Sequence, residues 1–206
     1  MTPTRRDTML GAAAALAMPA LARAAETPAW LNAPQVWKAD GAGLIMRADT
    51  GSDFWRLTLA KGRTMDTGHL YFREVAGDFV STVTVEADYG ADADQTGLMV
   101  RVNASNWMKT GVEWLHGVPH AATVFTRDWS DGSVERLAGW KGPIRFRVTR
   151  RGPILTCGYA RPGEAFFDTR LGHLPMGEAA QLGLTTCAPF GPGFEARFSD
   201  GTVGKA

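Results

Sequence analysis

Apolar and polar residues alternate with a period of two along most of the chain. Short alternating runs recur from "GLIMRAD" through "TGLMVRVN" and "IRFRVTRR" to "GFEARFSD", and Gly, Pro, Asn or Asp separates nearly every neighbouring pair. This period is typical of half-buried β-strands, and no ten-residue stretch shows helical spacing. We therefore predict an all-β sandwich or jelly roll with about a dozen short strands.

The first two dozen residues depart from this pattern. Arg5 and Arg6 precede the apolar run "MLGAAAALAMPALA", and Ala22-Arg23-Ala24 follows it as an A-x-A cleavage site. This is the layout of an export signal, and the run is too short to anchor the chain in a bilayer. We predict that residues 1–24 are a signal peptide. "TRRDTML" resembles a twin-arginine signal, with the general secretory route as the alternative, so the protein is expected to be periplasmic or secreted.

Cleavage would leave a single domain over residues 25–206 with little net charge. Removing Arg5, Arg6, Arg23 and Asp7 shifts the formal charge from +1 to −1. Such a domain gives no electrostatic reason to expect nucleic acid or an anionic membrane as a partner. The sequence leaves the oligomeric state open.

Two cysteines, Cys157 and Cys187, each lie in an apolar run that reads as a strand. They are either two buried thiols or one disulfide, since an exported protein works in an oxidising compartment. Neither the cysteines nor the histidines show the spacing of a zinc site. No cofactor or metal is predicted.

The stretch "QTGLMVRVNASNWMKTGVEWL", residues 95–115, reads as a hairpin. Its apolar rows must lie on the same side, because a slip by one residue would place a hydrophobic row in water. One register that satisfies this condition pairs Arg101 with Trp107, Met99 with Lys109, Gly97 with Gly111 and Gln95 with Glu113.

The opposite face of this hairpin then carries Gln95, Arg101, Trp107, Lys109 and Glu113. The two glycines between them leave a shallow trough that another group can approach. On the concave side of a curved sandwich, these groups suit a hydroxyl-rich ligand. The alternative is a solvated sheet face with ordinary cross-strand pairs.

Five ordered motifs resemble a known family, the regulation-of-enolase-like family of unknown function. They are "SDFWRLT", "DQTGLMVRVNASNWMKTGVEW", "RDWSDGS", "IRFRVTRRG" and "LGLTTCAPFGPGFEARF". The resemblance covers residues 33–198. It implies the concanavalin A-like lectin/glucanase fold, a jelly-roll sandwich of two curved antiparallel sheets. Arg127 departs from the family pattern, which usually has Ser there.

The resemblance also points to particular residues as a group. They are Asp53, Trp55, Arg56, Asp94, Gln95, Trp107, Lys109 and Glu113. Because this fold carries lectins, glycan hydrolases, lyases and adhesion modules, it does not fix the function.

Conventional two-carboxylate hydrolysis is not favoured by the sequence. Glucanases of this superfamily carry E-x-D-x-E or E-x-D-x-x-E on one strand. The nearest match here is Glu86-Ala87-Asp88, and Gly90 and Ala91 occupy the two possible positions of the third carboxylate. Glu113 is the one carboxylate of the hairpin face, so a hydrolase would need Asp53 or Asp94 as a partner. Glu113 could instead act alone as an acid or base beside Lys109.

Three tryptophans have polar neighbours and are candidates to stack on a sugar ring, namely Trp55, Trp107 and Trp129. Trp37, Trp114 and Trp140 are expected in the core. His69 follows a family-like motif and is placed at the rim, although a satisfied core histidine is the alternative. The acidic turn from Glu86 to Asp94 is expected to be solvated, with a calcium site as the alternative.

The leading hypothesis is an exported β-sandwich that binds carbohydrate or another polyhydroxylated ligand on its concave face. The ligand-binding residues are predicted to be Trp55, Arg56, His69, Gln95, Trp107, Lys109, Glu113 and Trp129. The second hypothesis is a glycoside hydrolase or lyase with Glu113 as the catalytic acid or base. The third is a periplasmic interaction module without a small-molecule site.

Overall fold

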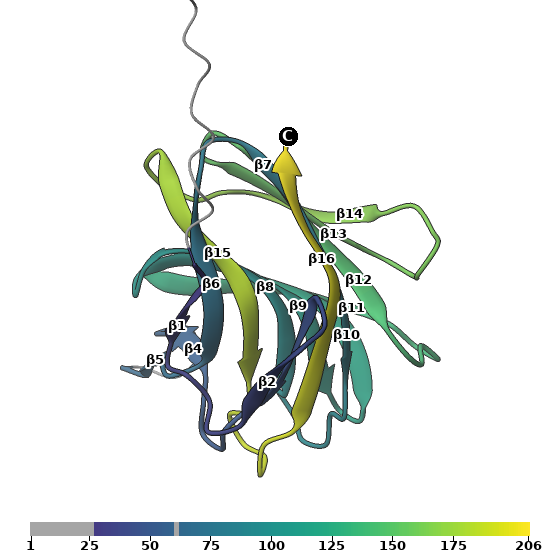
Figure 1. Ribbon diagram of the computed structural model, residues 1–206. Coiled ribbons are helices and arrows are strands. Elements are labelled where there is room, and N and C mark those ends of the chain that lie inside the picture. Colours follow the sequence, from purple (N-terminus) through teal and green to yellow (C-terminus); the bar gives the residue numbers. More distant parts are fainter. Residues whose placement is uncertain (1–26, 60–61) are drawn as a thin grey trace, which may run out of the picture.

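A computed structural model describes residues 27–59 and 62–206 of the chain (Figure 1). Two seven-stranded antiparallel sheets face each other, and no α-helix occurs in the part of the chain that is described. The predicted all-β sandwich is thereby confirmed. None of the described residues belongs to a helix long and apolar enough to cross a membrane. The predicted export signal, residues 1–24, lies outside the described residues.

Sheet 1 has the strand order β1-β6-β15-β8-β9-β10-β11. Its strands are β1 (Ala29–Leu31), β6 (His69–Ala76), β8 (Gln95–Asn103), β9 (Asn106–Leu115), β10 (Val118–Arg127), β11 (Trp129–Arg136) and β15 (Ala179–Cys187).

Sheet 2 has the order β14-β13-β12-β7-β16-β3-β2. Its strands are β2 (Trp37–Asp40), β3 (Gly43–Arg47), β7 (Phe79–Ala87), β12 (Ile144–Arg151), β13 (Ile154–Ala160), β14 (Phe167–His173) and β16 (Glu195–Lys205).

The predicted hairpin is the β8–β9 pair, and its register is the one written out above, among those that keep the apolar faces together. Gln95 pairs with Glu113, Gly97 with Gly111, Met99 with Lys109, and Arg101 with Trp107. The side-chain oxygen of Asn103 stabilises the turn by accepting hydrogen bonds from the backbone N–H groups of Ser105 and Asn106. The hydrophobic pattern therefore limits the register here to steps of two residues.

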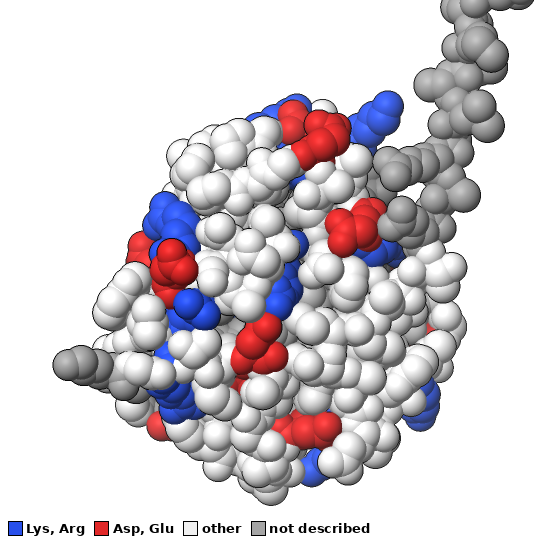
Figure 2. Space-filling model, turned by 90° about the vertical axis from the view of Figure 1, so that its left-hand side faces the viewer, with Lys and Arg blue, Asp and Glu red and all other residues white. Residues whose placement is uncertain are grey.

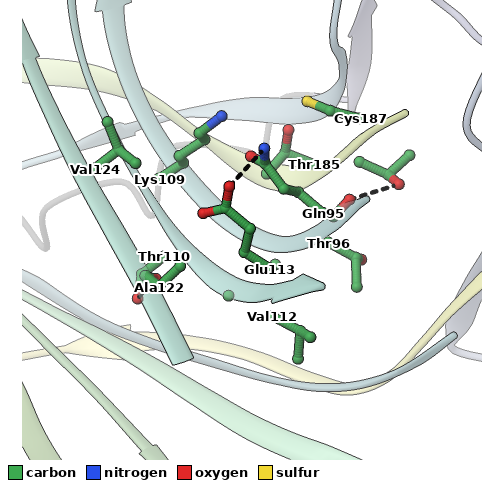
Figure 3. A pocket seen from close by; sticks show the side chains of 13 residues that line it. Gln95, Thr96, Lys109, Thr110, Val112, Glu113, Ala122, Val124, Thr185 and Cys187 are labelled. Atoms are coloured by element: carbon green, nitrogen blue, oxygen red, sulfur yellow. Dashed lines mark hydrogen bonds between the residues drawn. The ribbon is translucent and has the colours of Figure 1, made fainter. Parts of the chain in front are cut away.

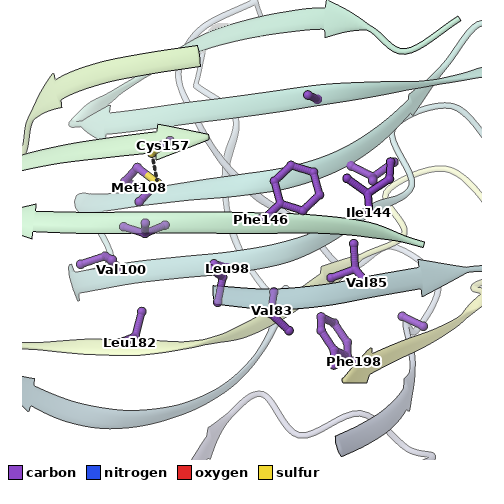
Figure 4. Packing of buried hydrophobic residues seen from close by; sticks show 14 of the residues in the cluster. Val83, Val85, Leu98, Val100, Met108, Ile144, Phe146, Cys157, Leu182 and Phe198 are labelled. Carbon is purple, nitrogen blue, oxygen red and sulfur yellow. Dashed lines mark hydrogen bonds between the residues drawn. The ribbon is translucent and has the colours of Figure 1, made fainter. Parts of the chain in front are cut away.

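The main core lies between the sheets, and Figure 4 shows side chains from both sheets meeting there. Sheet 2 contributes Val83, Phe146 and Phe198, and sheet 1 contributes Leu98 and Leu182, all of them buried. These are the apolar positions of alternating runs, so the period of two accounts for the core.

A second cluster lies on the other side of sheet 1, the outer face that is turned away from sheet 2. A two-stranded ribbon, β4 (Phe54–Arg56) and β5 (Thr64–Asp66), lies on this face. Phe54 packs there with Trp107 at 6.1 Å between ring centroids, together with Met99. We did not predict that part of the outer face would be covered.

The two cysteines are free and buried in different clusters. Cys157 belongs to the core between the sheets, 3.6 Å from the sulfur of Met108, whereas Cys187 belongs to the cluster beneath the ribbon. Of the two alternatives, the structure therefore shows two buried thiols.

Trp37 was expected in the core, and that expectation is wrong. It lies on the edge strand β2 with 45% of its surface exposed, against Trp30 at 5.3 Å between ring centroids. Trp114 and Trp140 are half-buried. An edge strand has no neighbour on one side, and the local sequence does not reveal which strand is at an edge.

Gly97 and Gly111 face each other where β8 and β9 approach closely. A Cβ atom at Gly111 would lie 2.0 Å from the carbonyl oxygen of Thr96 and 2.7 Å from the Gly97 Cα atom. Such contacts are with backbone, so a side chain here would force the two strands apart.

We predict that Gly111→Ala lowers the free energy of unfolding by at least about 1–3 kcal/mol, the usual cost of overpacking. Gly90→Ala is the matched control, because no atom lies within 4 Å of the Cβ it would gain. Urea unfolding followed by tryptophan fluorescence measures both variants. Equal free energies of unfolding for Gly111→Ala and Gly90→Ala would contradict the close approach of β8 and β9 at Gly111.

Candidate functional site

The part of the outer face that the ribbon leaves open forms a small hollow over β8, β9, β10 and β15 (Figure 3). It encloses about 290 Å³ of space, part of which is open solvent. Gln95, Lys109 and Glu113 project into it from the same side of their strands, the inner side of the curve in Figure 3. Three of the predicted site residues are therefore brought together.

Strand pairing explains which residues line the hollow. Across β15, β8, β9 and β10, one row in register is Cys187, Gln95, Glu113 and His120. The neighbouring row on the same face is Thr185, Gly97, Gly111 and Ala122. A floor of small residues thus lies beside a row of polar side chains.

Lys109 of β9 lines the hollow and also contacts the ribbon. The Lys109 ammonium donates a hydrogen bond to the Phe54 carbonyl oxygen at 2.8 Å and lies 3.8 Å from Asp53 Oδ1. Arg63 lies 3.4 Å from the other carboxylate oxygen of Asp53. Lys109 and Asp53 are both buried, so each charge compensates the desolvation of the other.

Glu113 is half-buried and accepts a hydrogen bond from the Gln95 amide at 3.5 Å. Burial raises its pKa, and the charge of Asp53 raises it further, while the cations Lys109 and His120 oppose the rise. A carboxyl group with a raised pKa keeps its proton to a higher pH than an ordinary glutamate does, which suits an acid or base. Asp53 is close enough to act on this pKa, so two carboxylates share the neighbourhood.

Thr185 provides a polar group that the sequence analysis did not select. Its side chain is buried and lines the hollow, and its hydroxyl has no hydrogen-bond partner among the described atoms. A buried hydroxyl without a partner is costly. Alternation in "QLGLTTC" places Thr185 on the outer face, but only the pairing of β15 with β8 shows that it lies beside Gly97.

Trp107 was predicted to stack on a ligand, and this prediction is wrong. Its strand position is on the outer face as expected, yet the side chain is fully buried beneath Phe54. The ribbon takes the place that a ligand would need. Trp107 is therefore a structural residue of the second cluster.

Trp55 and Arg56 are in the ribbon, and neither lines the hollow. The Trp55 indole N–H donates to the Thr58 carbonyl oxygen, and its ring lies beside Gly132 of β11, where an added Cβ atom would be 3.8 Å from it. Arg56 donates to the Asp128 carbonyl oxygen at 3.1 Å. Both residues fasten the ribbon to β11.

Trp129 and His69 also lie elsewhere. Trp129 is 60% exposed and precedes Ser130, whose hydroxyl accepts the Arg56 N–H, so alternation turns Trp129 away from the outer face. His69 is buried; its Nδ1 lies 2.6 Å from the Asn32 carbonyl oxygen and its Nε2 accepts the N–H of Asp49. It is a satisfied core histidine, which was the alternative interpretation.

The acidic turn before β8 uses its carboxylates to hold the backbone. Asp94 accepts the N–H groups of Gly90 and Ala91, both at 2.9 Å, and Asp92 accepts that of His116 at 2.8 Å. Within residues 27–59 and 62–206, no three His, Cys, Asp or Glu side chains are grouped as metal ligands.

We predict that Trp107→Ala lowers the free energy of unfolding by about 3–5 kcal/mol, the usual cost of removing a buried tryptophan side chain. Trp129→Ala is the matched control, and because its side chain is exposed we expect a change within about 0.5 kcal/mol. Thermal or urea unfolding compares the two. A large loss of stability in Trp129→Ala with none in Trp107→Ala would contradict the assignment of Trp107 to the buried cluster and of Trp129 to the surface.

The raised pKa of Glu113 predicts how stability depends on pH. The folded state holds this proton more tightly than the unfolded chain, whose Glu pKa is about 4.3. The stabilisation from protonated Glu113 is thus complete below that value and lost as the pH rises through the folded-state pKa. The free energy of unfolding of Glu113→Gln, taken relative to that of the natural protein, should therefore be higher at pH 7 than at pH 4.

Glu164→Gln, at an exposed position, is the control, and its relative free energy of unfolding should not change between the two pH values. Urea unfolding at both pH values measures the difference, and a gain that is the same at both would refute the assignment.

Comparisons with known proteins agree with this architecture. The Saccharomyces cerevisiae protein named Regulation of enolase protein 1 is 29% identical over 171 residues, which cover 83% of this chain and 86% of that protein. The crystal structure of a functionally unknown protein from Saccharomyces cerevisiae superposes with a TM-score of 0.83 at 28% identity, covering 87% of this chain and 96% of that one.

An alginate lyase from Klebsiella pneumoniae shares the fold alone. Its TM-score is 0.57 at 11% identity, with coverage of 82% of this chain and 84% of the lyase. Residues 30–206 match the DUF1349 family, described as a protein of unknown function. This match confirms the family resemblance inferred from the five motifs, and the chain belongs to the DUF1349 family.

Proposed function

We propose that this protein is exported and binds carbohydrate or a similar polyhydroxylated ligand in the hollow of its outer face. The observation that carries the proposal is the convergence of Gln95, Lys109, Glu113 and the unpartnered Thr185 hydroxyl over a glycine floor. An amide, a cation, a carboxylate and a hydroxyl together can both donate to and accept from sugar hydroxyl groups. Export is proposed from the sequence of residues 1–24.

The size of the hollow limits the ligand. The space of about 290 Å³ includes open solvent, and only about 20 Å³ of it can hold the centre of a water-sized molecule. We therefore expect the hollow to admit a single hydroxyl or hydroxymethyl group of a sugar, with the rest of the carbohydrate in solvent or along the sheet. On the side shown in Figure 2, acidic and basic residues are interspersed, and most of the surface is uncharged. A neutral ligand fits such a surface better than a polyanion does.

An enzyme of the glycoside hydrolase or lyase type is the second candidate. It is favoured by the raised pKa of Glu113 and by Asp53, which lies near enough to contribute to that rise. In this case Glu113 carries the proton, and Lys109 stabilises negative charge that develops beside it. The third candidate, an interaction module without a small-molecule site, gains no support from a hollow that contains an unpartnered buried hydroxyl.

A glycan array followed by calorimetry tests the proposal. We expect Glu113→Gln and Gln95→Ala to weaken the binding of any oligosaccharide found by about tenfold or more, the effect of losing a hydrogen bond to a charged group. Trp129→Ala serves as the control that should bind normally, because this side chain points away from the outer face.

The same oligosaccharides are then incubated with the protein and analysed for new reducing ends and unsaturated products. Products that disappear in Glu113→Gln would establish the enzyme, whereas binding without products would establish recognition alone. Absence of binding to every oligosaccharide, or unchanged binding by both hollow variants, would end the proposal and leave the interaction module.

A further inference from the structure

Phe190 is an exposed aromatic residue close to the outer-face hollow. Four aromatic side chains of the described residues are exposed, namely Trp37, Trp129, Phe167 and Phe190. Trp37 and Phe167 belong to sheet 2, and Trp129 is turned away from the outer face of sheet 1. Phe190 is 67% exposed and follows three residues after Cys187, which lines the hollow (Figure 3). Three residues of chain span at most about 11 Å, so Phe190 lies within that distance of the hollow's edge.

The backbone around Phe190 is held on both sides. The Ala188 N–H donates a hydrogen bond to the Ser52 hydroxyl at 3.0 Å. After Phe190, Gly191 lies so close to Ala91 that an added Cβ atom would be 2.6 Å from the Ala91 Cβ atom. The ring is therefore presented from a fixed stretch of backbone, which reduces the ordering that a ligand must impose on binding.

A series of contacts joins the Phe190 ring to the hollow. The Arg63 guanidinium carbon lies 5.5 Å from the centre of the ring. Arg63 is also 3.4 Å from Asp53 Oδ2, and Asp53 Oδ1 is 3.8 Å from the ammonium of Lys109, which lines the hollow. A cation is attracted to the face of an aromatic ring, so Arg63 orients Phe190. The contacts and the short stretch of chain from Cys187 place Phe190 beside the hollow independently of each other.

The surroundings of Phe190 favour an uncharged ligand with C–H groups on its faces. The cations Arg63 and Lys109 are balanced by the carboxylates of Asp53 and Glu113, so no net charge attracts an ion. An aromatic ring packs well against C–H groups. A pyranose whose hydroxyl groups are all equatorial presents such groups on both faces of its ring. The hollow admits only one hydroxyl or hydroxymethyl group, so the rest of such a sugar needs a surface outside it.

We propose that Phe190 is a stacking residue of the carbohydrate site, and that the ligand is an oligosaccharide of pyranose units with equatorial hydroxyl groups. One hydroxyl or hydroxymethyl group enters the hollow, and a neighbouring sugar ring lies against Phe190, whose orientation Arg63 maintains. The assignment rests on the proposed function, because it adds a residue to the same site. Phe190 supplies the aromatic contact that Trp55, Trp107 and Trp129 do not provide.

Calorimetric titration with cellotetraose tests the role of Phe190. Phe190→Ala should weaken binding by about three- to tenfold, the usual effect of losing an aromatic contact. Phe190→Tyr keeps the ring and should bind as the natural protein does. Phe167→Ala removes a similarly exposed phenylalanine from sheet 2 and is the matched control, which should bind normally.

Titration with related sugars tests the class of ligand. Glucose should bind more weakly than cellotetraose, because a single ring does not fill both the hollow and the surface at Phe190. Each ring of β-1,4-mannotetraose carries one axial hydroxyl group, which obstructs one face, so this sugar should also bind more weakly. Circular dichroism checks that every variant is folded.

The outcomes separate the role of Phe190 from the proposed function. If Glu113→Gln weakens cellotetraose binding and Phe190→Ala does not, the carbohydrate site stands and Phe190 has no part in it. If Phe190→Tyr binds as weakly as Phe190→Ala, stacking is refuted. Mannotetraose binding as tight as that of cellotetraose, or binding of other glycans without cellotetraose, overturns the assigned ligand class. Absence of binding to every glycan ends both the proposed function and the role of Phe190.

Discussion

The buried ammonium of Lys109 is the interaction on which the outer face of this protein depends. It joins the ribbon to sheet 1 through the Phe54 carbonyl oxygen and compensates the buried carboxylate of Asp53. Removing one partner from such a pair costs about 3–5 kcal/mol, since the other charge is left buried without compensation. The ribbon in turn covers Trp107, while Lys109 itself lines the open hollow. One cation thus lies where the covered part of the outer face meets the open part.

The sheet architecture could be predicted from the sequence because it follows from a local rule. Strict alternation assigns each side chain to a face, and matching of apolar faces limits the β8–β9 register to steps of two residues, one of which pairs Gln95 with Glu113 as observed. The ribbon could not be predicted in this way. Its two strands have three residues each, and what they cover depends on tertiary packing. Trp107 was accordingly assigned to the correct face and to the wrong environment.

The candidate site was predicted in part for the same reason. Gln95, Lys109 and Glu113 belong to one hairpin, so their grouping is a local property. Thr185 is about seventy residues away along the chain, and its place beside Gly97 appears only when β15 pairs with β8. Trp55 and Arg56 were selected by family resemblance, and in the structure they contact Gly132 and Ser130 of β11 and so hold the ribbon against that strand. Residues that characterise a family can thus shape a binding surface without touching a ligand.

The two glycines of the floor have a structural role that also shapes the site. The close approach of β8 and β9 excludes a Cβ atom at Gly97 and Gly111, so packing alone accounts for both residues. The same absence of side chains opens the hollow beside Glu113.

The two faces of sheet 1 carry different side chains because the residues of each strand alternate. On β15, Thr185 lines the outer-face hollow, while Leu182 and Leu184 face sheet 2. A ligand in the hollow would therefore contact none of the side chains that pack between the sheets. The tight Gly97–Gly111 contact opposes a change in the spacing of β8 and β9, so we expect occupation of the hollow to leave the core between the sheets unchanged.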